Sequence, residues 1–139
     1  MRIIAVDLGK ARTGLAICDE GEKLASPIGV ITEYHQEKLL EKIWQVAKEH
    51  GAQMFVVGLP RNMDGTEGES AQNARAFSKE LARISNLPVE LSDERGTTIT
   101  AHNYLNHTNT RGKRRKEVID TVAAVIILED FLRRRTLSQ

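Results

Sequence analysis

Apolar positions follow two different periods along the chain, and the change of period predicts the order of its elements. Residues 1–9, 13–18 and 24–32 are short apolar runs separated by polar turns, which predicts three strands. Their short connections indicate an antiparallel meander. Pro27 lies inside the third run and has no backbone N–H to donate, so we expect this strand at a sheet edge or with a bulge.

Helical spacing begins near residue 36. Residues 36–50 and 70–84 each place their apolar side chains on one stripe, which predicts two amphipathic helices. Gly51 ends the first of them, and Asn86 ends the second.

Strands return between and after these two helices. Residues 54–58 form an apolar strand, and the turn formers of 59–68 predict a loop at its carboxyl end. A fifth strand starts at 89–91, and a short helix is predicted over about 97–106. The pattern therefore predicts an α/β fold in a single domain, residues 1–139, with a mixed five-stranded sheet of three antiparallel strands and then two more, and helices on both faces.

Composition limits the classes of protein to consider. A chain of 139 residues with 40% hydrophobic residues fits one compact domain. Its net charge of +1 creates no field over the whole protein, so affinity for nucleic acid must come from a local patch. The single cysteine, Cys18, excludes an internal disulfide and is predicted to be a buried thiol. Without a signal peptide or a run of about 18 apolar residues, we expect a soluble cytoplasmic protein that does not enter a membrane.

Asp7 is a carboxylate inside the first apolar run. Burying an ionised carboxylate is costly unless it is paired, hydrogen-bonded or bound to a cation, so this residue requires a partner. Gly9 follows, where the missing side chain would let a ligand approach the backbone. In the alternative interpretation, Asp7 only caps the strand or begins a turn with Gly9 and Lys10.

Asp120 is a second carboxylate among apolar residues, in a final helix predicted over 117–134. Positions three, four and seven residues later hold Ala123, Ala124 and Ile127, so Asp120 shares the face that should pack on the sheet. The alternative is that Asp120 interacts favourably with the helix dipole, a contribution of roughly 0.3–1 kcal/mol.

The pair Asp93 and Glu94 supplies a third candidate, at the end of a strand that we expect next to the first one. Neighbours on a strand point to opposite faces, so only one of the two can face Asp7, and the residues alone leave the choice open. Three carboxylates without a His or Cys cluster suit a hard cation, Mg²⁺ or Mn²⁺. Two such ions about 3.5–4 Å apart cleave phosphodiesters in nucleases.

Residues 107–116 contain no apolar residue and five basic ones, which predicts a mobile basic loop. Such a loop would make phosphate contacts independent of base sequence. The alternative is a solubilising linker. The residues proposed to hold the nucleic-acid backbone are Arg111, Lys113, Arg114, Arg115 and Lys116.

Four ordered motifs carry a resemblance that covers essentially the whole chain. They are AVDLG (5–9), VVGLPRNMDGTEG (56–68), DERGTT (93–98) and IDTVAAVIIL (119–128). Together they resemble the YqgF family, also called RuvX, whose members are known as pre-16S rRNA nucleases and Holliday-junction-resolvase homologues. The order of the elements, with acidic residues in the first strand and last helix, resembles the ribonuclease H-like fold.

This resemblance implies a magnesium-dependent endonuclease acting at the 5′ end of the 16S rRNA precursor. By position, the acidic residues of the family fall on Asp7, Glu94 and Asp120, which would bind the metal, so the resemblance favours Glu94 over Asp93. Many members have a Ser-Thr pair after the DER segment, where this chain has residues 96–98 (GTT), a departure that leaves the metal set intact.

Further positions could bind substrate. Arg95 could clamp a phosphate through its guanidinium, or form a salt bridge with the acidic pair before it. Arg61 and Asn62 lie in the loop after the fourth strand, where open α/β sheets usually bind ligands. Aromatic residues make up only 4% of the chain, which favours duplex or backbone recognition over readout of single-stranded bases.

Other functions remain as alternatives. The segment DLGKARTG (7–14) also resembles the phosphate-binding hairpin of sugar kinases and actin-like ATPases, which close two domains over ATP, whereas one domain is predicted here. A Holliday junction resolvase acting on branched DNA would use the same chemistry, and a non-catalytic factor in ribosome assembly or transcription could keep an acidic site without turnover. No heptad or spare amphipathic helix predicts a dimer, so we expect a monomer, and a stable dimer would favour the resolvase. A ribosomal precursor particle is a further candidate partner.

Overall fold

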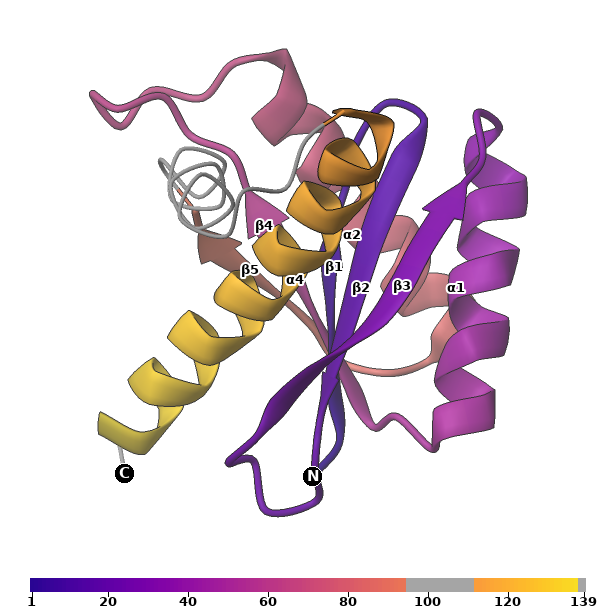
Figure 1. Ribbon diagram of the computed structural model, residues 1–139, viewed down its shortest axis with the longest axis vertical. Coiled ribbons are helices and arrows are strands. Elements are labelled where there is room, and N and C mark those ends of the chain that lie inside the picture. Colours follow the sequence, from indigo (N-terminus) through magenta and orange to yellow (C-terminus); the bar gives the residue numbers. More distant parts are fainter. Residues whose placement is uncertain (95–111, 138–139) are drawn as a thin grey trace.

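The computed structural model describes the backbone of residues 1–94 and 112–137, and the side chains of residues 1–94 and 121–137. Its elements follow one another as drawn in Figure 1. They are β1 (Ile3–Asp7), β2 (Arg12–Cys18), β3 (Ala25–Thr32), α1 (Gln36–His50), β4 (Met54–Leu59), α2 (Glu69–Ser85), β5 (Val89–Asp93) and α4 (Gly112–Leu137).

The five strands form one mixed sheet in the order β3-β2-β1-β4-β5. β1 and β2 are antiparallel, as are β2 and β3, so the predicted meander is confirmed. β4 is parallel to β1 and β5 is parallel to β4, which confirms the mixed sheet.

Pro27 accounts for two features of β3, its edge position and its bulge. The strand lies at one edge of the sheet, and its register shifts where Leu15 pairs with Gly29 but Ala16 pairs with Pro27. Ile28 is therefore the extra residue of a bulge. A proline without an N–H is tolerated at such a place, as the sequence predicted.

The expectation that the fifth strand lies next to the first is wrong. β4 lies between them, pairing with β1 through Val56 opposite Ala5 and with β5 through Val57 opposite Leu91. All six residues of β4 are buried, which suits a central strand, whereas β5 is only partly buried and forms the other edge.

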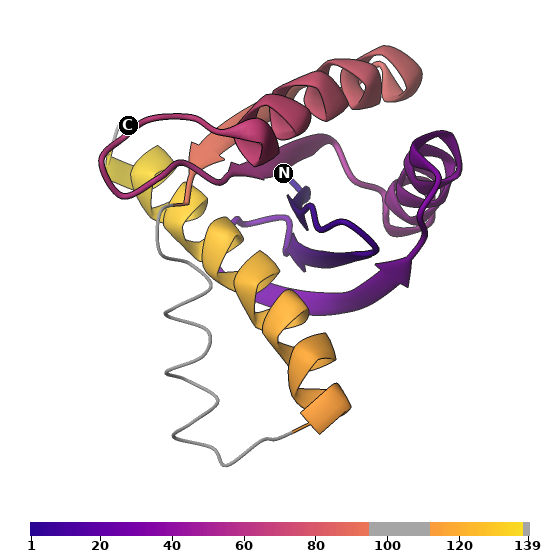
Figure 2. The ribbon, with the colours of Figure 1, turned by 90° about the horizontal axis from the view of Figure 1, so that it is seen from above.

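Helices cover both faces of the sheet, as Figures 1 and 2 show: α4 crosses one face, and α1 and α2 lie against the other. The core on the side of α1 and α2 includes Ile4, Val6, Ile43, Phe55, Val57 and Phe77. The core under α4 includes Ile3, Ala5, Val56, Ala124, Ile127 and Leu128. Alternate residues of β1 and β4 thus belong to opposite cores, because successive side chains of a strand point to opposite faces.

The predicted bounds of the last helix are too short. α4 begins at Gly112 and ends at Leu137, rather than spanning 117–134. Residues 112–116 are therefore helical, so the basic loop predicted over 107–116 is wrong for these five residues. The segment was predicted as a loop because it contains no apolar residue, but Lys and Arg are good helix formers even though four basic residues at a helix amino terminus oppose the helix dipole.

The short helix predicted over 97–106 lies outside the described residues. Within them, none of the helices has the length and apolar character needed to cross a membrane.

Cys18 is a buried free thiol, as predicted. Its sulfur accepts a hydrogen bond from the Ile3 N–H at 3.3 Å, and its S–H donates to the Met1 carbonyl at 3.4 Å. Burial raises the pKa of this thiol. These contacts give Cys18 a structural role at the amino end of β1.

Candidate active site

Asp7 is the last residue of β1 and is half-buried. Ile3 and Ala5 belong to the core under α4, so the alternation of the strand puts Asp7 on the same face. The glycine that follows has a structural explanation: a Cβ on Gly9 would lie 2.2 Å from the Arg12 carbonyl oxygen. Gly9 is therefore required by the tight connection to β2, independently of any ligand.

Glu94 follows β5 directly and is buried at 9% exposure. Its N–H donates to the Leu59 carbonyl at 3.1 Å, which ties the carboxyl ends of β4 and β5 together. Its side chain lies beside Gly58, where an added Cβ would be 3.5 Å from Glu94 Cγ and 2.6 Å from Ile127 Cδ1. A glycine in β4 thus leaves room for both the carboxylate arm and α4.

Two residues that sequence reasoning missed contact the Glu94 carboxylate. The Ser92 hydroxyl and the Arg134 guanidinium both donate to Glu94 Oε1, the latter over 3.3 Å, and Arg134 also donates to the Ser92 oxygen. The guanidinium offsets the charge of a carboxylate whose side chain is only 5% exposed. One sequence signal was present, because Arg134 lies 14 positions after Asp120, close to four helical turns.

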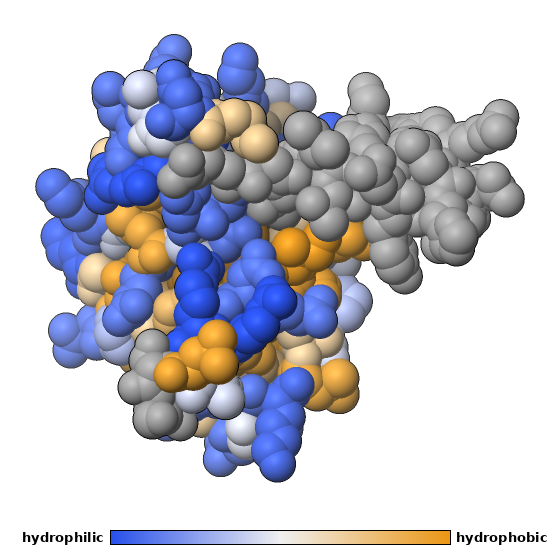
Figure 3. Space-filling model, turned by 90° about the vertical axis from the view of Figure 1, so that its left-hand side faces the viewer, coloured by the Kyte–Doolittle hydropathy of each residue, from blue (hydrophilic) through white to orange (hydrophobic). Residues whose placement is uncertain are grey.

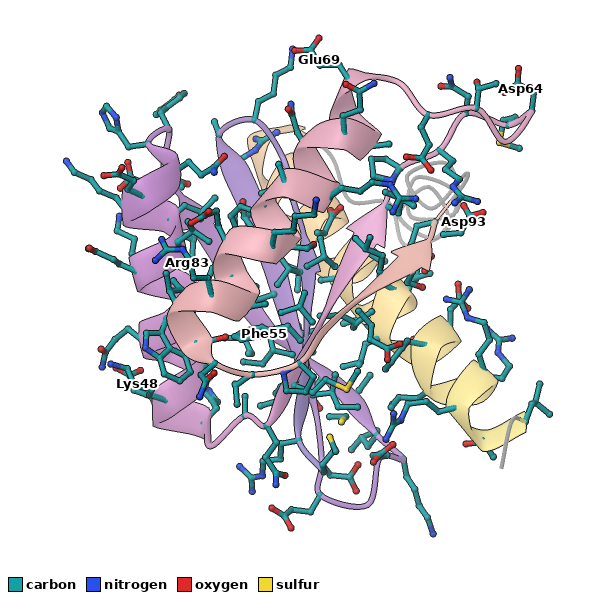
Figure 4. All side chains as sticks on the ribbon, turned by 180° about the vertical axis from the view of Figure 1, so that it is seen from behind. Lys48, Phe55, Asp64, Glu69, Arg83 and Asp93 are labelled. Carbon is teal, nitrogen blue, oxygen red and sulfur yellow. The ribbon has the colours of Figure 1, made fainter. Side chains whose placement is uncertain are left out.

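Asp93 has a different environment from its neighbour. Arg61 Nη1 lies 3.5 Å from Asp93 Oδ2, in an ion pair between the loop after β4 and the end of β5. Figure 4 shows Asp93 at the head of β5, below the loop that carries Asp64. Glu94, in contact with α4, is therefore the member of the pair on the face of Asp7.

Arg61 also binds a second carboxylate, that of Glu67, with 3.2 Å between Nε and Oε2. Glu67 in turn accepts two hydrogen bonds from Arg75 of α2, at 2.8 and 2.7 Å. The Arg75 guanidinium lowers the pKa of Glu67 to about 2. The neighbouring Asn62 donates its side-chain amide to the Thr66 hydroxyl at 2.9 Å. Both predicted binding residues of this loop thus help to hold it in shape.

α4 carries the third candidate carboxylate. Ala123, Ala124 and Ile127 of α4 are buried at 2%, 0% and 1% exposure, and position 120 lies in the same helix three, four and seven residues before them. The side chain of Asp120 lies outside the described part. The described residues alone contain no group of three His, Cys, Asp or Glu that could hold a metal ion.

The side chains of the remaining predicted binding residues are outside the described part of the chain. Arg95 and Arg111 are outside the described residues. Positions 113–116, which hold Lys113, Arg114, Arg115 and Lys116, form the beginning of α4, and only their backbone is described.

Comparison with known proteins decides the family. The model of the RuvX family, described as Holliday junction resolvase, matches residues 1–134. The chain belongs to the RuvX family. Its relatives include a protein of Anaeromyxobacter sp. (strain Fw109-5), 42% identical over 132 residues, with 95% of this chain and 96% of the relative covered. A relative from Pelotomaculum thermopropionicum is 44% identical over 133 residues, with 95% and 86% covered. Both bear the name "Putative pre-16S rRNA nuclease".

Solved structures identify the fold of this RuvX protein. RuvC of T. thermophilus in complex with a Holliday junction substrate matches with a TM-score of 0.57 and 15% identity, over 98% of this chain and 96% of that one. The fowlpox virus Holliday junction resolvase matches with a TM-score of 0.59 and 11% identity, over 96% and 99%. The RuvX chain therefore has the ribonuclease H-like α/β fold that the order of its elements suggested.

Proposed function

We propose that this RuvX protein is a metal-dependent endonuclease that processes the 5′ end of pre-16S rRNA. One observation carries the proposal: Asp7 and Glu94, from β1 and the end of β5, lie on the sheet face covered by α4, the helix that contains Asp120. Relatives at 42% and 44% identity named for this activity support the choice of substrate.

Asp7, Glu94 and Asp120 would hold Mg²⁺ or Mn²⁺. Carboxylate oxygens are the donors that these hard cations prefer, and the donor set contains no sulfur or imidazole. Bound there, the metal would supply an activated water and stabilise the charge that develops on the phosphate oxygens. Arg134 and Ser92 hold the Glu94 carboxylate in one orientation, so the ligand is already aimed before a cation arrives.

Binding of the RNA backbone is assigned to basic residues of the loop after β4, of the segment that follows β5 and of the start of α4. Figure 1 shows α4 beginning at the same end of the sheet as the carboxyl end of β1, and a helix amino terminus favours phosphate because of its partial positive charge. The proposed phosphate-binding residues are Arg95, Arg111, Lys113, Arg114, Arg115 and Lys116, with Arg61 and Asn62 on the loop after β4. We further propose that the enzyme acts as a monomer, in the cytoplasm, on a ribosomal precursor particle.

Cleavage of branched DNA is the second candidate. It is favoured by the description of the family model, Holliday junction resolvase, and by two resolvases among the structures of similar fold. A resolvase must make paired cuts, which calls for a symmetric dimer.

The purified protein decides between these functions when it is offered a 16S precursor with its 5′ leader and a four-way DNA junction. We expect cleavage of the leader with Mg²⁺ or Mn²⁺, no cleavage after chelation, and a monomer by light scattering. Symmetric cuts in the junction by a dimer, with an intact leader, would replace the proposal by the resolvase. Binding of the leader without cleavage under any metal would indicate a non-catalytic assembly factor.

A further inference from the structure

The loop after β4, residues 60–68, has an internally bonded tip. The Asn62 N–H donates to the Thr66 carbonyl at 2.8 Å, and the Gly65 N–H donates to the Asn62 carbonyl at 2.9 Å. Asp64 Oδ1 accepts from the Thr66 N–H at 3.0 Å and from its hydroxyl at 2.7 Å. Gly65 adopts φ +90°, which is readily available only to glycine. These bonds hold the tip in one conformation.

The base of this loop is fixed to the candidate active site. Arg61 bridges Glu67 within the loop and Asp93 at the end of β5, while Glu67 is bound by Arg75 of α2. Glu94 follows Asp93 directly and donates its N–H to Leu59, immediately before the loop. The base of the loop is therefore held beside Glu94, and the tip extends from this base.

Met63 sits in this tip with 72% of its surface exposed. Its neighbours Asn62 and Asp64 are polar, and both take part in the bonds that shape the tip. The side of the molecule that carries β5 is largely hydrophilic, with smaller apolar patches, in Figure 3. Figure 4 shows the loop with Asp64 projecting beyond the end of the sheet. A long apolar side chain is thus presented to solvent from a preformed support.

An apolar side chain cannot gain from contact with phosphates, so in a nucleic acid its favourable partner is the face of a base. Apolar side chains, methionine among them, enter between base steps and unstack them in several nucleic-acid complexes. Thioether groups are polarizable and pack well on aromatic rings. A support that is already ordered loses little conformational entropy on binding.

We propose that Met63 is a positioning residue that packs against an unstacked base beside the scissile phosphate of the precursor RNA. This inference rests on the proposed nuclease function. Contact with the base fixes the adjoining scissile phosphate relative to Asp7 and Glu94. The contribution of Met63 therefore appears mainly in the rate of cleavage. The energy gained at the base face is offset by the cost of unstacking, so substrate affinity changes little.

The test uses a 16S precursor leader with 2-aminopurine beside the cleavage site, because this base fluoresces more strongly when it is unstacked. Ca²⁺ replaces Mg²⁺ in the fluorescence measurement, and cleavage is measured separately with Mg²⁺. We expect the wild-type protein to raise the fluorescence and Met63→Ala to lose most of that rise. The variant should also lower kcat by up to about tenfold, the upper end for a thioether packed on an aromatic ring, with KM changed less than about threefold.

Conservative and distant variants separate this role from a structural one. Met63→Leu should restore both signals, whereas Met63→Gln, similar in length but polar, should not. Leu24→Ala is the matched control, since Leu24 is also exposed, at 66%, but lies in the β2–β3 connection at the opposite end of the sheet. It should leave both signals unchanged.

Met63→Ala or Met63→Gln with wild-type fluorescence and kcat would overturn the inference. A wild-type protein that raises the fluorescence through Met63 but does not cleave the leader with any metal would support the inference and refute the proposed nuclease. Cleavage without any fluorescence change dependent on Met63 would refute the inference and leave the nuclease standing. A protein that does not bind the leader would refute both.

Discussion

Arg134 Nη2 lies 3.3 Å from Glu94 Oε1, although 40 residues separate the two in the chain. The Glu94 side chain is 5% exposed and that of Arg134 is 51% exposed, so a cation at the surface compensates a carboxylate in the interior. This pair connects α4 to the end of β5 at the place where we propose that a metal ion binds.

Replacing Arg134 with Gln should lower the free energy of unfolding by about 1–2 kcal/mol without divalent ions. The buried Glu94 charge loses its compensating partner, and the half-exposed position of Arg134 makes the loss smaller than for a fully buried pair. Saturating Mg²⁺ should narrow the difference, because a cation bound to the folded state supplies the missing charge. Urea unfolding with and without Mg²⁺ measures both effects.

Arg133→Gln is the control for this variant. Arg133 pairs with Asp130 on the surface, with 67% and 37% of the two side chains exposed, so its loss should change stability by less than about 0.5 kcal/mol. An Arg134→Gln protein as stable as the wild type would show that the contact between Arg134 and Glu94 does not contribute to stability.

Gly58→Ala should destabilise the fold by about 1–3 kcal/mol and reduce cleavage. The new methyl group would lie 2.6 Å from Ile127 Cδ1, and Ile127 is 1% exposed and cannot swing into solvent. Relief requires a shift of α4 or of Glu94, both of which belong to the site. Gly21→Ala is the control, since its methyl group would meet Asp19 Oδ2 at an ordinary 3.4 Å. Equal melting temperatures for the two variants would contradict this packing argument.

Local pattern predicted much of the fold because its causes are local. Short apolar runs bounded by turn residues predicted the five strands, and Pro27 indicated both the edge and the bulge of β3. Gly51 and Asn86 end α1 and α2 in the left-handed conformation, as turn-forming residues should. The position of β4 between β1 and β5 was missed, because strand order depends on how helices pack over the sheet.

The site was predicted in the same uneven way. Asp7 was selected as a candidate because a carboxylate in an apolar strand is costly, and strand alternation implied that only one of Asp93 and Glu94 could lie on the face of Asp7. Ser92 and Arg134 were missed because their partner is distant in the chain and neither is unusual in its own segment. The start of α4 at Gly112 was missed because residues 112–116 contain no apolar residue to show helical spacing.

Glu67 should make stability depend on pH in the acid range. Its pKa is lowered from 4.5 to about 2 by the two hydrogen bonds from Arg75. The folded state therefore favours the ionised form, and the stabilisation is complete above about pH 4.5 and is lost as the pH falls towards 2. The difference in urea midpoint between the wild type and Glu67→Gln should be largest at pH 7 and shrink below pH 4.5.

Arg75→Gln should remove most of the same pH dependence, because Arg75 is the main donor that lowers the pKa of Glu67, while Arg61 still contacts this carboxylate. If the urea midpoints of the wild type and Glu67→Gln differ by a constant amount from pH 7 to pH 3, the Glu67–Arg75 ion pair does not form in solution.

Neutralising the basic start of α4 should weaken RNA binding equally for different sequences. Phosphate contacts release counterions, so each lost contact should reduce the slope of log K against log salt by roughly 0.7–0.9. Fluorescence anisotropy at several salt concentrations measures this slope for a triple Gln variant of Lys113, Arg114 and Arg115. The control triple variant, at the opposite end of the sheet, changes Arg2, Lys23 and Lys48. Equal slopes for both triple variants would mean that phosphate binds elsewhere, around Arg61 and Arg95.

Titration calorimetry of Mg²⁺ into the wild type and Asp7→Asn tests the central claim most directly. The claim is that Asp7, Glu94 and Asp120 hold the metal on which cleavage depends. We expect a magnesium-binding signal for the wild type and none for the variant, with cleavage of the precursor leader lost in parallel. The variant should remain folded and equal or exceed the stability of the metal-free wild type, because clustered carboxylates repel one another. Unchanged Mg²⁺ affinity in folded Asp7→Asn would contradict the account.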